Sequence, residues 1–419
     1  MPPSDKKSPP VFTPYQKFVV AALAFLQFAV ILDFMIVAPL GALVMPALNM
    51  SPRDFGLIVS AYAFSAGASG LLVAGFADRY DRKKLLLFFY AGFLLATLWC
   101  GLAQTFESLL AARIVTGFFG GVIGSVLLAI ATDLFAPNLR GRVMAVIQTA
   151  FSASQVLGLP LALYASNHWN WQAPFFLVVA LGVAGGALLA WQLKPVTAHL
   201  AAAGNVHPIK HLIATITARR HLPAFATTVL LATGGFMIMP FSSVFTVNNL
   251  GIHVSELPTI YLVTGLCTIV TGPLIGKLVD AIGRMKVFLF GSAMTMLMVL
   301  VYTNLGVVSL PVVIIVNVLM FIGIFSRMIP YQAMAASVPE LHMRGSFNAI
   351  SASIQQLSGG AAALVAGHLV HIGNNGKLEG FGRVGWVVVG TTIVGAFLVS
   401  QVNKEIKQRE AVAAVANAS

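Results

Sequence analysis

Residues 78–84 read Asp-Arg-Tyr-Asp-Arg-Lys-Lys and form a short polar segment between two apolar runs, 55–77 and 85–104. A weaker copy, Asp-Ala-Ile-Gly-Arg-Met-Lys, occupies 280–286, almost half the chain further on, and again separates two apolar runs. Self-similarity at a fixed period indicates an internal duplication. In a membrane chain it predicts a transporter built from two related bundles.

A second pair of loops supports the duplication. Residues 137–142 read Pro-Asn-Leu-Arg-Gly-Arg, and residues 339–345 read Pro-Glu-Leu-His-Met-Arg-Gly. Each follows a long apolar run, and the distance along the chain between these two loops nearly equals that between the first two. Two independent loops with one offset make chance similarity a poor explanation.

The composition excludes a soluble globular domain. The chain is 58% hydrophobic and 9% charged, whereas ordinary globular proteins carry about 25% charged residues. Runs of about 20 apolar residues mark membrane-spanning helices. The sequence predicts twelve, at approximately 18–45, 55–77, 85–104, 108–134, 142–165, 173–193, 224–248, 258–279, 287–305, 311–337, 346–371 and 384–402. The first exceeds the apolar core of a cleaved signal peptide, so we expect it to be retained.

The basic residues predict the topology. With twelve spans and a cytoplasmic amino terminus, 20 of the 25 Lys and Arg residues fall in cytoplasmic segments, 3 in outer loops and 2 inside spans. Basic segments stay on the cytoplasmic side during insertion. We therefore expect an integral protein of a bacterial-type inner (plasma) membrane with both termini in the cytoplasm. The net charge of +12 then reflects topology and not nucleic-acid binding.

The predicted fold is an all-α membrane protein of two pseudo-symmetric six-helix bundles. Its parts are a tail (1–17), a first bundle (18–193), a cytoplasmic linker (194–223), a second bundle (224–402) and a tail (403–419). Apolar residues with helical spacing between 209 and 216 favour a short amphipathic helix in the linker. The last segment is expected to be frayed or disordered.

The sequence lacks the residue patterns of enzymes and metal sites. Cys100 and Cys267 lie inside apolar spans, where free cysteines behave as small hydrophobes. It shows no paired catalytic carboxylates, zinc-helix motif, phosphate-binding glycine loop or nucleophile elbow. We therefore expect no enzymatic activity, metal or cofactor.

With these loops and spans the chain resembles the major facilitator superfamily, and within it the twelve-span proton-coupled exporters of the drug and sugar efflux type. The family pattern between spans two and three is Gly-x-x-x-Asp-Arg-x-Gly-Arg-Arg/Lys. The matching residues are Asp78, Arg79, Arg82 and Lys83, and in the second copy Gly276, Asp280, Gly283 and Arg284. Ala74 and Asp81 replace the glycines of the first copy, and Ala281 replaces the first arginine of the second.

Two further motifs match the family unequally. Arg113 with Gly117 and Gly121 resembles the fourth-span motif, whereas the fifth-span antiporter motif survives only as Ser154, Gly158 and Pro160. The resemblance implies two bundles around a central cavity, rocking to alternate access. It also implies that the Asp78 loop pairs with Asp133 and with helix ends of the other half, latching the outward-facing state. Alternatively, its bases only enforce topology.

Asp33 is the only carboxylate well inside a predicted span. At about 1.5 Å per helical residue it lies roughly 24 Å along span one, and Arg113 lies roughly 9 Å from the outer end of span four. Similar depth allows an ion pair, and the resemblance places both spans around the cavity. Arg327 lies near the middle of span ten. An ionised group at such depth costs at least about 2.5–3.5 kcal/mol, which favours a functional role for all three.

Asp33 and Arg113 are predicted to couple protons to transport. Burial disfavours the ionised form of a carboxyl group, whereas a neighbouring arginine favours it. Protonation of Asp33 would release Arg113 and change the affinity for cargo as the cavity changes sides. Alternatively, the two residues form a static ion pair that only fixes helix packing.

Other residues are candidates for the cavity wall. They are Gln148, Gln155, Phe241, Tyr331, Gln332 and Gln355, and for each, helix packing or interhelical hydrogen bonding is an equal explanation. Two arginines against one aspartate make the candidate cavity positive, which favours neutral, zwitterionic or anionic cargo over cations. His368 and His371 are interpreted as surface or structural residues because no carboxylate partner is adjacent.

These observations predict proton-coupled export (antiport) of a small organic molecule by a monomer. The expected partners are cargo, protons and membrane lipids, with no nucleic acid. One alternative is a proton-independent uniporter or importer of a small metabolite, which the weak fifth-span motif favours. Another is a non-transporting receptor or scaffold on the same fold, which would not need two polar loops and a cavity carboxylate.

Overall fold

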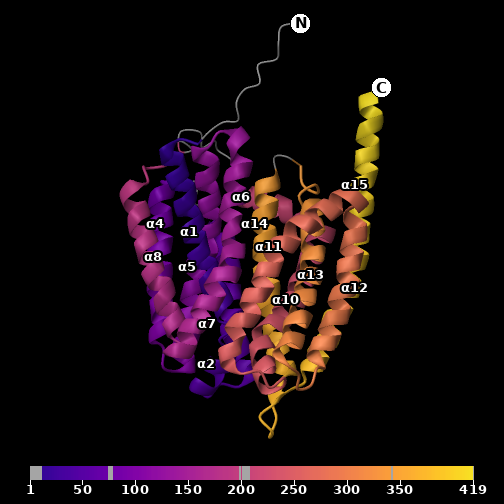
Figure 1. Cartoon of the computed structure of the whole chain (residues 1–419). Coiled ribbons are helices and arrows are strands. Elements are labelled where there is room, and N and C mark those ends of the chain that lie inside the picture. The colour runs from indigo at the N-terminus through magenta and orange to yellow at the C-terminus, as the bar shows by residue number, and fades with distance from the viewer. Residues whose placement is uncertain (1–11, 74–78, 198–199, 201–207, 341–342, 419) are drawn as a thin grey trace.

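A computed structural model describes residues 12–73, 79–197, 200, 208–340 and 343–418 (Figure 1). The first half contains α1 (Pro14–Ile36), α2 (Gly41–Ala47), α3 (Pro52–Val73), α4 (Arg82–Leu102), α5 (Phe106–Leu134), α6 (Pro137–Ala153), the π-helix η2 (Ser154–Gly158), α7 (Leu159–His168) and α8 (Ala173–Gln192). The linker helix is α9 (Pro208–Thr217). The second half contains α10 (Leu222–Asn248), η4 (Val254–Glu256), α11 (Leu257–Ile282), α12 (Arg284–Thr303), α13 (Leu310–Ala335), α14 (Arg344–Leu369), the strands β1 (His371–Ile372) and β2 (Leu378–Glu379), and α15 (Phe381–Ala418).

Helix boundaries follow local capping signals. Thr13 caps α1 through a capping box with Gln16, and the Thr105 side chain accepts a hydrogen bond from the backbone of Ser108 at the start of α5. Such caps satisfy amide groups that have no partner within the first helical turn. Helices α6, α8, α10 and α13 instead carry proline in their first turn, where its missing amide hydrogen costs nothing.

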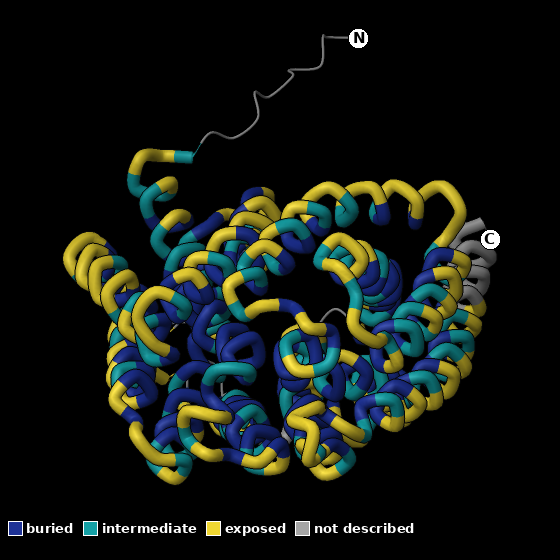
Figure 2. The backbone as a smooth tube through the Cα atoms, turned by 60° about the horizontal axis from the view of Figure 1, so that its bottom comes forward, coloured by how far each residue is buried: buried dark blue, intermediate teal, exposed yellow. Residues whose placement is uncertain are grey.

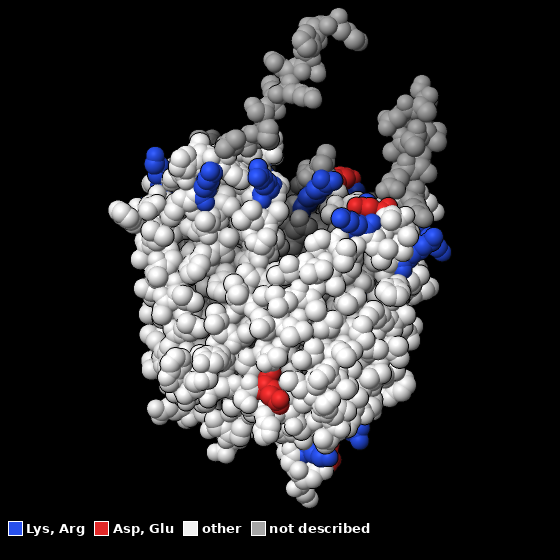
Figure 3. Space-filling model, in the orientation of Figure 1, with Lys and Arg blue, Asp and Glu red and all other residues white. Residues whose placement is uncertain are grey.

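The helices stand side by side and give the molecule two distinct ends (Figure 1). One end carries the start of α1 and the end of α15, and Lys and Arg side chains gather there (Figure 3), so we name it the basic end. The opposite end carries α2 and the β1–β2 hairpin. On the face that Figure 3 shows, the surface between the ends is almost uncharged, and the molecule exposes apolar side chains such as Phe88, Trp191 and Phe397. Such a band matches the hydrocarbon core of a bilayer.

Twelve elements cross this band. Eleven helical segments of the described chain are long and apolar enough to span a membrane, and the twelfth is α14, which is richer in Ser, Asn and Gln. Helix α14 packs along α3, where a Cβ on Gly56 would approach the Ala363 carbonyl to 2.9 Å and one on Gly67 would approach Leu357 to 2.8 Å. Because much of α14 meets protein and not lipid, it tolerates polar side chains.

Three local features refine or correct the predictions. Predicted span one ends at Ile36, and the chain continues as the separate helix α2. In the fifth span, the motif residues Ser154 and Gly158 begin and end a π-helix, and Pro160 follows in the first turn of α7. The predicted frayed or disordered tail is wrong, because α15 continues to Ala418. Its alanine-rich sequence explains this, since alanine has the highest helix propensity. The predicted linker helix is present as α9.

Glycines bring α3 and α5 into close contact. A Cβ on Gly117 would lie 2.4 Å from the Tyr62 carbonyl oxygen, and one on Gly121 would lie 2.4 Å from the Ala66 carbonyl oxygen. These distances are too short for any side chain, so the fourth-span glycines are required for backbone-to-backbone packing. Small residues at helix interfaces serve this purpose in lipid.

The two bundles share a hydrophobic core at the opposite end. The largest cluster of buried apolar residues joins Leu40 and Phe55 of the first bundle to Phe241 and Leu250 of the second. Two hydrogen bonds also cross there, from Ser243 Oγ to the Ala38 carbonyl oxygen (2.9 Å) and from Asn167 Nδ2 to the Val254 carbonyl oxygen (3.2 Å). Figure 2, with this end turned forward, shows buried segments facing inward and exposed segments around the rim.

Towards the basic end the cores separate. One cluster there belongs to the first bundle alone, and another belongs to the second bundle with Leu71 packed against it. Helix α11 shows how the two bundles move apart. A Cβ on Gly265 would lie 3.0 Å from Val156 of η2, whereas a Cβ on Gly272 or on Gly276 would have no atom within 4 Å. At 100° per residue these three glycines share one helical face. The α11 face that meets the first bundle at Gly265 is therefore open about 16 Å further towards the basic end.

Candidate functional site

Asp33 and Arg113 form a buried ion pair where the two bundles meet. Asp33 lies in the last turn of α1 and Arg113 in the second turn of α5, so both are near the opposite end. Arg113 Nη1 donates to Asp33 Oδ2 at 2.8 Å, and the two side chains are 1% and 0% exposed. The pair predicted from helical depth is therefore present.

One residue from each of two neighbouring helices contacts this pair. Thr97 of α4 donates a hydrogen bond to Asp33 Oδ1 at 3.3 Å. The Arg113 guanidinium lies over the Tyr62 ring of α3, 4.3 Å from the ring centroid, an arrangement that favours the positive charge. Sequence reasoning missed both residues, because hydropathy predicts a span but not which face of it turns towards Asp33. Their polar atoms inside apolar runs were the only available signal.

A small void next to Arg113 connects the pair to both bundles. Its volume is ≈ 10 Å³, about the minimum that holds one water molecule. It is lined by Arg113, Phe34, Val37, Ala38 and Val59 from the first bundle, and by Phe236, Met239 and Pro240 from the second. Any change in the charge of the pair therefore acts directly on the surface where the bundles touch.

Among the described residues Arg327 has no such partner. It lies on α13, it is 5% exposed, and its Nε is buried without a hydrogen bond to any described group. It lies near α10, where a Cβ added to Gly234 would be 4.0 Å from Arg327 Nη1. The structure does not bring Arg327 into the Asp33–Arg113 pair.

The other cavity candidates have different surroundings. Gln148, Gln332 and Gln355 are exposed, whereas Gln155 is buried in η2 with its carbonyl against Gly265. Phe241 is fully buried against Phe55 in the shared core. Tyr331 is buried, donates to the Ala224 carbonyl oxygen and hydrogen-bonds the Thr228 hydroxyl. In this structure Phe241 packs in the shared core and Tyr331 forms interhelical hydrogen bonds, as the alternative explanation for both has it, and their place in a cavity wall stays a prediction.

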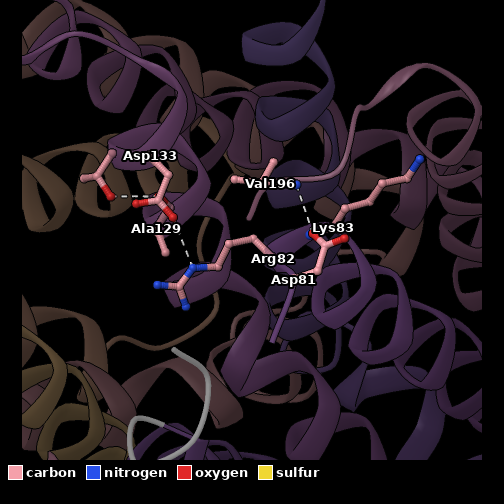
Figure 4. Close-up of polar contacts among 7 residues, drawn as sticks. Asp81, Arg82, Lys83, Ala129, Asp133 and Val196 are labelled. Carbon is pink, nitrogen blue, oxygen red and sulfur yellow. Dashed lines mark hydrogen bonds and ion pairs between the residues drawn. The ribbon is translucent and has the colours of Figure 1, made fainter. Parts of the chain in front are cut away.

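The first polar loop joins two helices of the first bundle to each other and to the start of the linker (Figure 4). Arg82 Nε pairs with Asp133 Oδ2 at 3.2 Å, linking the start of α4 to the end of α5. Asp81 Oδ1 accepts hydrogen bonds from the backbone of Lys83 (2.9 Å) and of Val196 (3.0 Å). Asp81 therefore caps α4 and holds the segment that follows α8, a role that the family's glycine has no side chain to perform. Arg79 is exposed, and Asp78 lies outside the described residues.

The second polar loop is built differently. Gly283 separates α11 from α12 at φ 92°, a left-handed conformation that favours glycine. Asp280 is exposed and Arg284 half-buried, and within the described chain they form no ion pair. Gly276 belongs to the open face of α11.

His371 is a surface residue, as predicted, but the reason given for that prediction was wrong, because a carboxylate partner is present. His371 of β1 lies opposite Glu379 of β2, and its Nε2 is 3.2 Å from Glu379 Oε2. The partner was missed because it lies eight positions away and is brought close only by the hairpin. Both side chains are exposed, so the contact is a surface one, whereas His368 bonds only within its own helix, to the Leu364 carbonyl oxygen.

Sequence comparison places this geometry among transporters. The pattern of the Major Facilitator Superfamily matches residues 23–402. The chain is 26% identical over 268 residues to the uncharacterized MFS-type transporter YceJ of Bacillus subtilis, covering 63% of this chain and 67% of YceJ. It is 28% identical over 163 residues to the multidrug resistance protein fnx1 of Schizosaccharomyces pombe, covering 39% of this chain and 30% of that protein. It is 28% identical over 152 residues to a probable sugar efflux transporter of Helicobacter pylori, covering 35% and 37%.

Solved structures share the fold at low identity. A bacterial homolog of the human lysosomal transporter Spinster, inward-facing and unoccupied, superposes with a TM-score of 0.74 at 15% identity, covering 95% of this chain and 99% of that one. A point mutant of the nucleoside transporter NupG superposes with a TM-score of 0.71 at 14% identity, covering 92% and 99%. The family pattern covers both predicted bundles, and its members are transporters and not enzymes. The chain belongs to the Major Facilitator Superfamily and is a secondary transporter of small molecules.

Proposed function

We propose that this chain exports a small organic molecule across the inner membrane in exchange for protons, as a monomer. The observation that carries the proposal is the Asp33–Arg113 pair, which is buried, lies in the membrane band and touches the surface between the bundles. Intramembrane carboxylates of this kind mark proton pathways. One proton entering down a potential of 100 mV supplies about 2.3 kcal/mol.

The proposed cycle uses the opposing effects on Asp33. Arg113 and Thr97 favour the carboxylate, whereas full burial favours the protonated acid. When Asp33 takes a proton, Arg113 loses its counter-charge and the contacts at the void must change. We propose that this change drives the bundles, with functional halves at 18–193 and 224–402, to exchange an opening on one side for an opening on the other.

We assign the basic end to the cytoplasm. Lys and Arg gather there together with the start of α1 and the end of α15 (Figure 3), and cytoplasmic segments of membrane proteins are rich in these residues. The opening along α11 then faces the cytoplasm, where an exporter collects its cargo. Under this assignment the Arg82–Asp133 contact is part of the latch that closes the cytoplasmic side in another state, with Arg79, Lys83 and the Asp280–Arg284 loop as further members.

One observation favours the second candidate, a proton-independent uniporter or importer. The fifth span keeps little of the family's antiporter motif, and its Ser154–Gly158 segment is a π-helix. The names of relatives favour export, since multidrug resistance and sugar efflux proteins are among them. The cargo itself is proposed to be neutral, zwitterionic or anionic.

Purified protein in liposomes that contain a pH-sensitive dye tests the proposal. A proton gradient is imposed, and a panel of anionic, neutral and cationic compounds is added outside. Proton antiport predicts that at least one compound changes the rate of proton movement through wild-type protein. If a compound crosses the membrane with no proton movement, the uniporter replaces the exporter as the better account.

A further inference from the structure

Arg327 differs from every other buried arginine in the described chain. Three arginines are buried: Arg82, Arg113 and Arg327. Arg82 pairs with Asp133 and Arg113 with Asp33, whereas no described carboxylate lies within ion-pair distance of Arg327. An unpaired charge inside the membrane is costly, and it is kept where it serves transport.

Arg327 is also placed too deep for its charge to reach water along the helix. It lies eight residues from Ala335, the end of α13 at the basic end, or about 12 Å of helix. That distance exceeds the length of an arginine side chain. The guanidinium therefore cannot extend along the helix to the membrane surface, as the charged groups of residues near helix ends do. The positive charge must therefore be compensated by a group inside the protein.

The surroundings of Arg327 contain polar atoms without a described partner. Gly234 of α10 presents only backbone to the guanidinium. The Nε nitrogen is buried without a hydrogen-bond partner among the described residues. Val388 of α15 lies 3.6 Å from the same Gly234 Cβ position, and Thr392, one turn further along α15, has a buried hydroxyl that is likewise without a described partner. Arg327 Nε and Thr392 Oγ1 are thus two buried polar atoms without a described partner, and α13 and α15, which carry them, both approach Gly234 of α10.

The charges around Arg327 indicate which kind of ligand it would bind. Asp33 and Arg113 neutralise each other, so of the three charges that the sequence predicts for the cavity only that of Arg327 is left uncompensated. We propose that Arg327 is a binding site for a monoanionic group of the cargo, a carboxylate or its equivalent, held end-on by the two Nη nitrogens. This inference rests on the proposed transport function and narrows its cargo to organic anions and zwitterions. Planar, bidentate recognition of carboxylates is what arginine provides and lysine does not.

Matched probes in a binding assay test the site without requiring transport. The full chain is purified in detergent, and its thermal unfolding is followed with acetate, benzoate, benzamide or benzylamine, the last three sharing one ring but differing in charge. The variants are Arg327→Gln, Arg327→Lys and the control Arg383→Gln, which removes a positive charge from an exposed position at the opposite end. The apparent affinity follows from the stabilisation at each ligand concentration.

We expect acetate or benzoate to stabilise wild-type protein and Arg383→Gln with an apparent Kd at least about tenfold lower than for Arg327→Gln, since a charge-assisted pair is lost. Arg327→Lys should keep the preference for the anions with weaker affinity. The stabilisation by benzamide and by benzylamine should not depend on the residue at position 327. The inference is overturned if the anions stabilise Arg327→Gln as well as wild type, or if they stabilise neither.

A second readout separates binding from packing. Without ligand, Arg327→Gln should unfold at the same temperature as wild type or higher, because the exchange removes an unpaired buried charge. A clear fall would identify Arg327 as a structural residue and overturn the inference. Anion binding without cargo-driven proton movement would contradict the proposed coupling alone. Proton-coupled transport of neutral or cationic cargo, with no anion binding, would contradict this site alone.

Discussion

Asp33 and Arg113 hold opposite charges where neither has contact with water, so each depends on the other. Their single hydrogen bond at 2.8 Å, with Thr97 on the second carboxylate oxygen, leaves Arg113 Nε buried and without a described partner. A pair with an unsatisfied donor is less firmly held than a bidentate one. That property suits a contact which must open during a transport cycle.

The dependence of these two charges on each other can be measured as stability. Arg113→Gln leaves the buried Asp33 carboxylate without its counter-charge and should lower the free energy of unfolding by about 3–5 kcal/mol. The double variant Asp33→Asn/Arg113→Gln removes both charges and should recover most of that loss. Thermal unfolding in detergent measures both. Equal losses in the single and double variants would contradict a mutual role and indicate simple packing.

Asp81 gives a second prediction at this scale. Asp81→Ala removes the cap of α4 and the bond to the Val196 amide, and should cost about 1 kcal/mol or more. Asp81→Asn keeps an acceptor oxygen and serves as the control, with a much smaller loss. Chemical or thermal unfolding of the purified protein compares the two. Identical behaviour of both variants would show that the side-chain bonds of Asp81 do not stabilise the fold.

Single helices explain where sequence reasoning succeeded and failed. Apolar runs predicted all twelve spans, although α14, which is buried against α3, is less uniformly apolar than the other eleven. The rotation of a helix about its axis was not predictable, so Thr97 and Tyr62 were missed. Depth along the helix was predictable, because rise per residue is constant, and it placed Asp33 at the level of Arg113.

The contact between α3 and α5 provides a test at the scale of elements. Gly121→Ala introduces a Cβ 2.4 Å from the Ala66 carbonyl oxygen, so the helices must separate. We expect a loss of about 1–3 kcal/mol, as for other overpacked sites. Gly272→Ala is the matched control, since its Cβ meets nothing within 4 Å. Thermal unfolding should separate the two variants clearly, and equal stability would contradict the close packing of α3 on α5.

The whole molecule combines a shared hydrophobic core at the opposite end with separate cores towards the basic end. The duplicated loops predicted two bundles, and the fold confirms them. The sequence could not predict which end of the cavity is open, because both states of a rocking transporter are built from the same helices. The spacing of Gly265, Gly272 and Gly276 on one face of α11 acquires meaning only when the neighbouring bundle is seen.

This opening can be probed with single cysteines. In a Cys267→Ser background, which keeps the buried Cys100, a cysteine at Gly272 or Gly276 should react with a membrane-impermeant thiol reagent applied from the basic end. A cysteine at Gly265, which faces Val156, should react at least about tenfold more slowly, as expected for a buried thiol. Equal rates at the three positions would contradict the divergence of the bundles along α11.

The most direct test of the account concerns Asp33 as the proton carrier. Wild-type protein and Asp33→Asn are reconstituted in liposomes with a cargo found in the dye assay, and two rates are measured: exchange of labelled for unlabelled cargo without a gradient, and uphill cargo movement driven by a proton gradient. The account predicts that Asp33→Asn keeps exchange, because the bundles still rock, and loses uphill movement with its proton flux. Uphill, proton-driven transport by Asp33→Asn at the wild-type rate would contradict it.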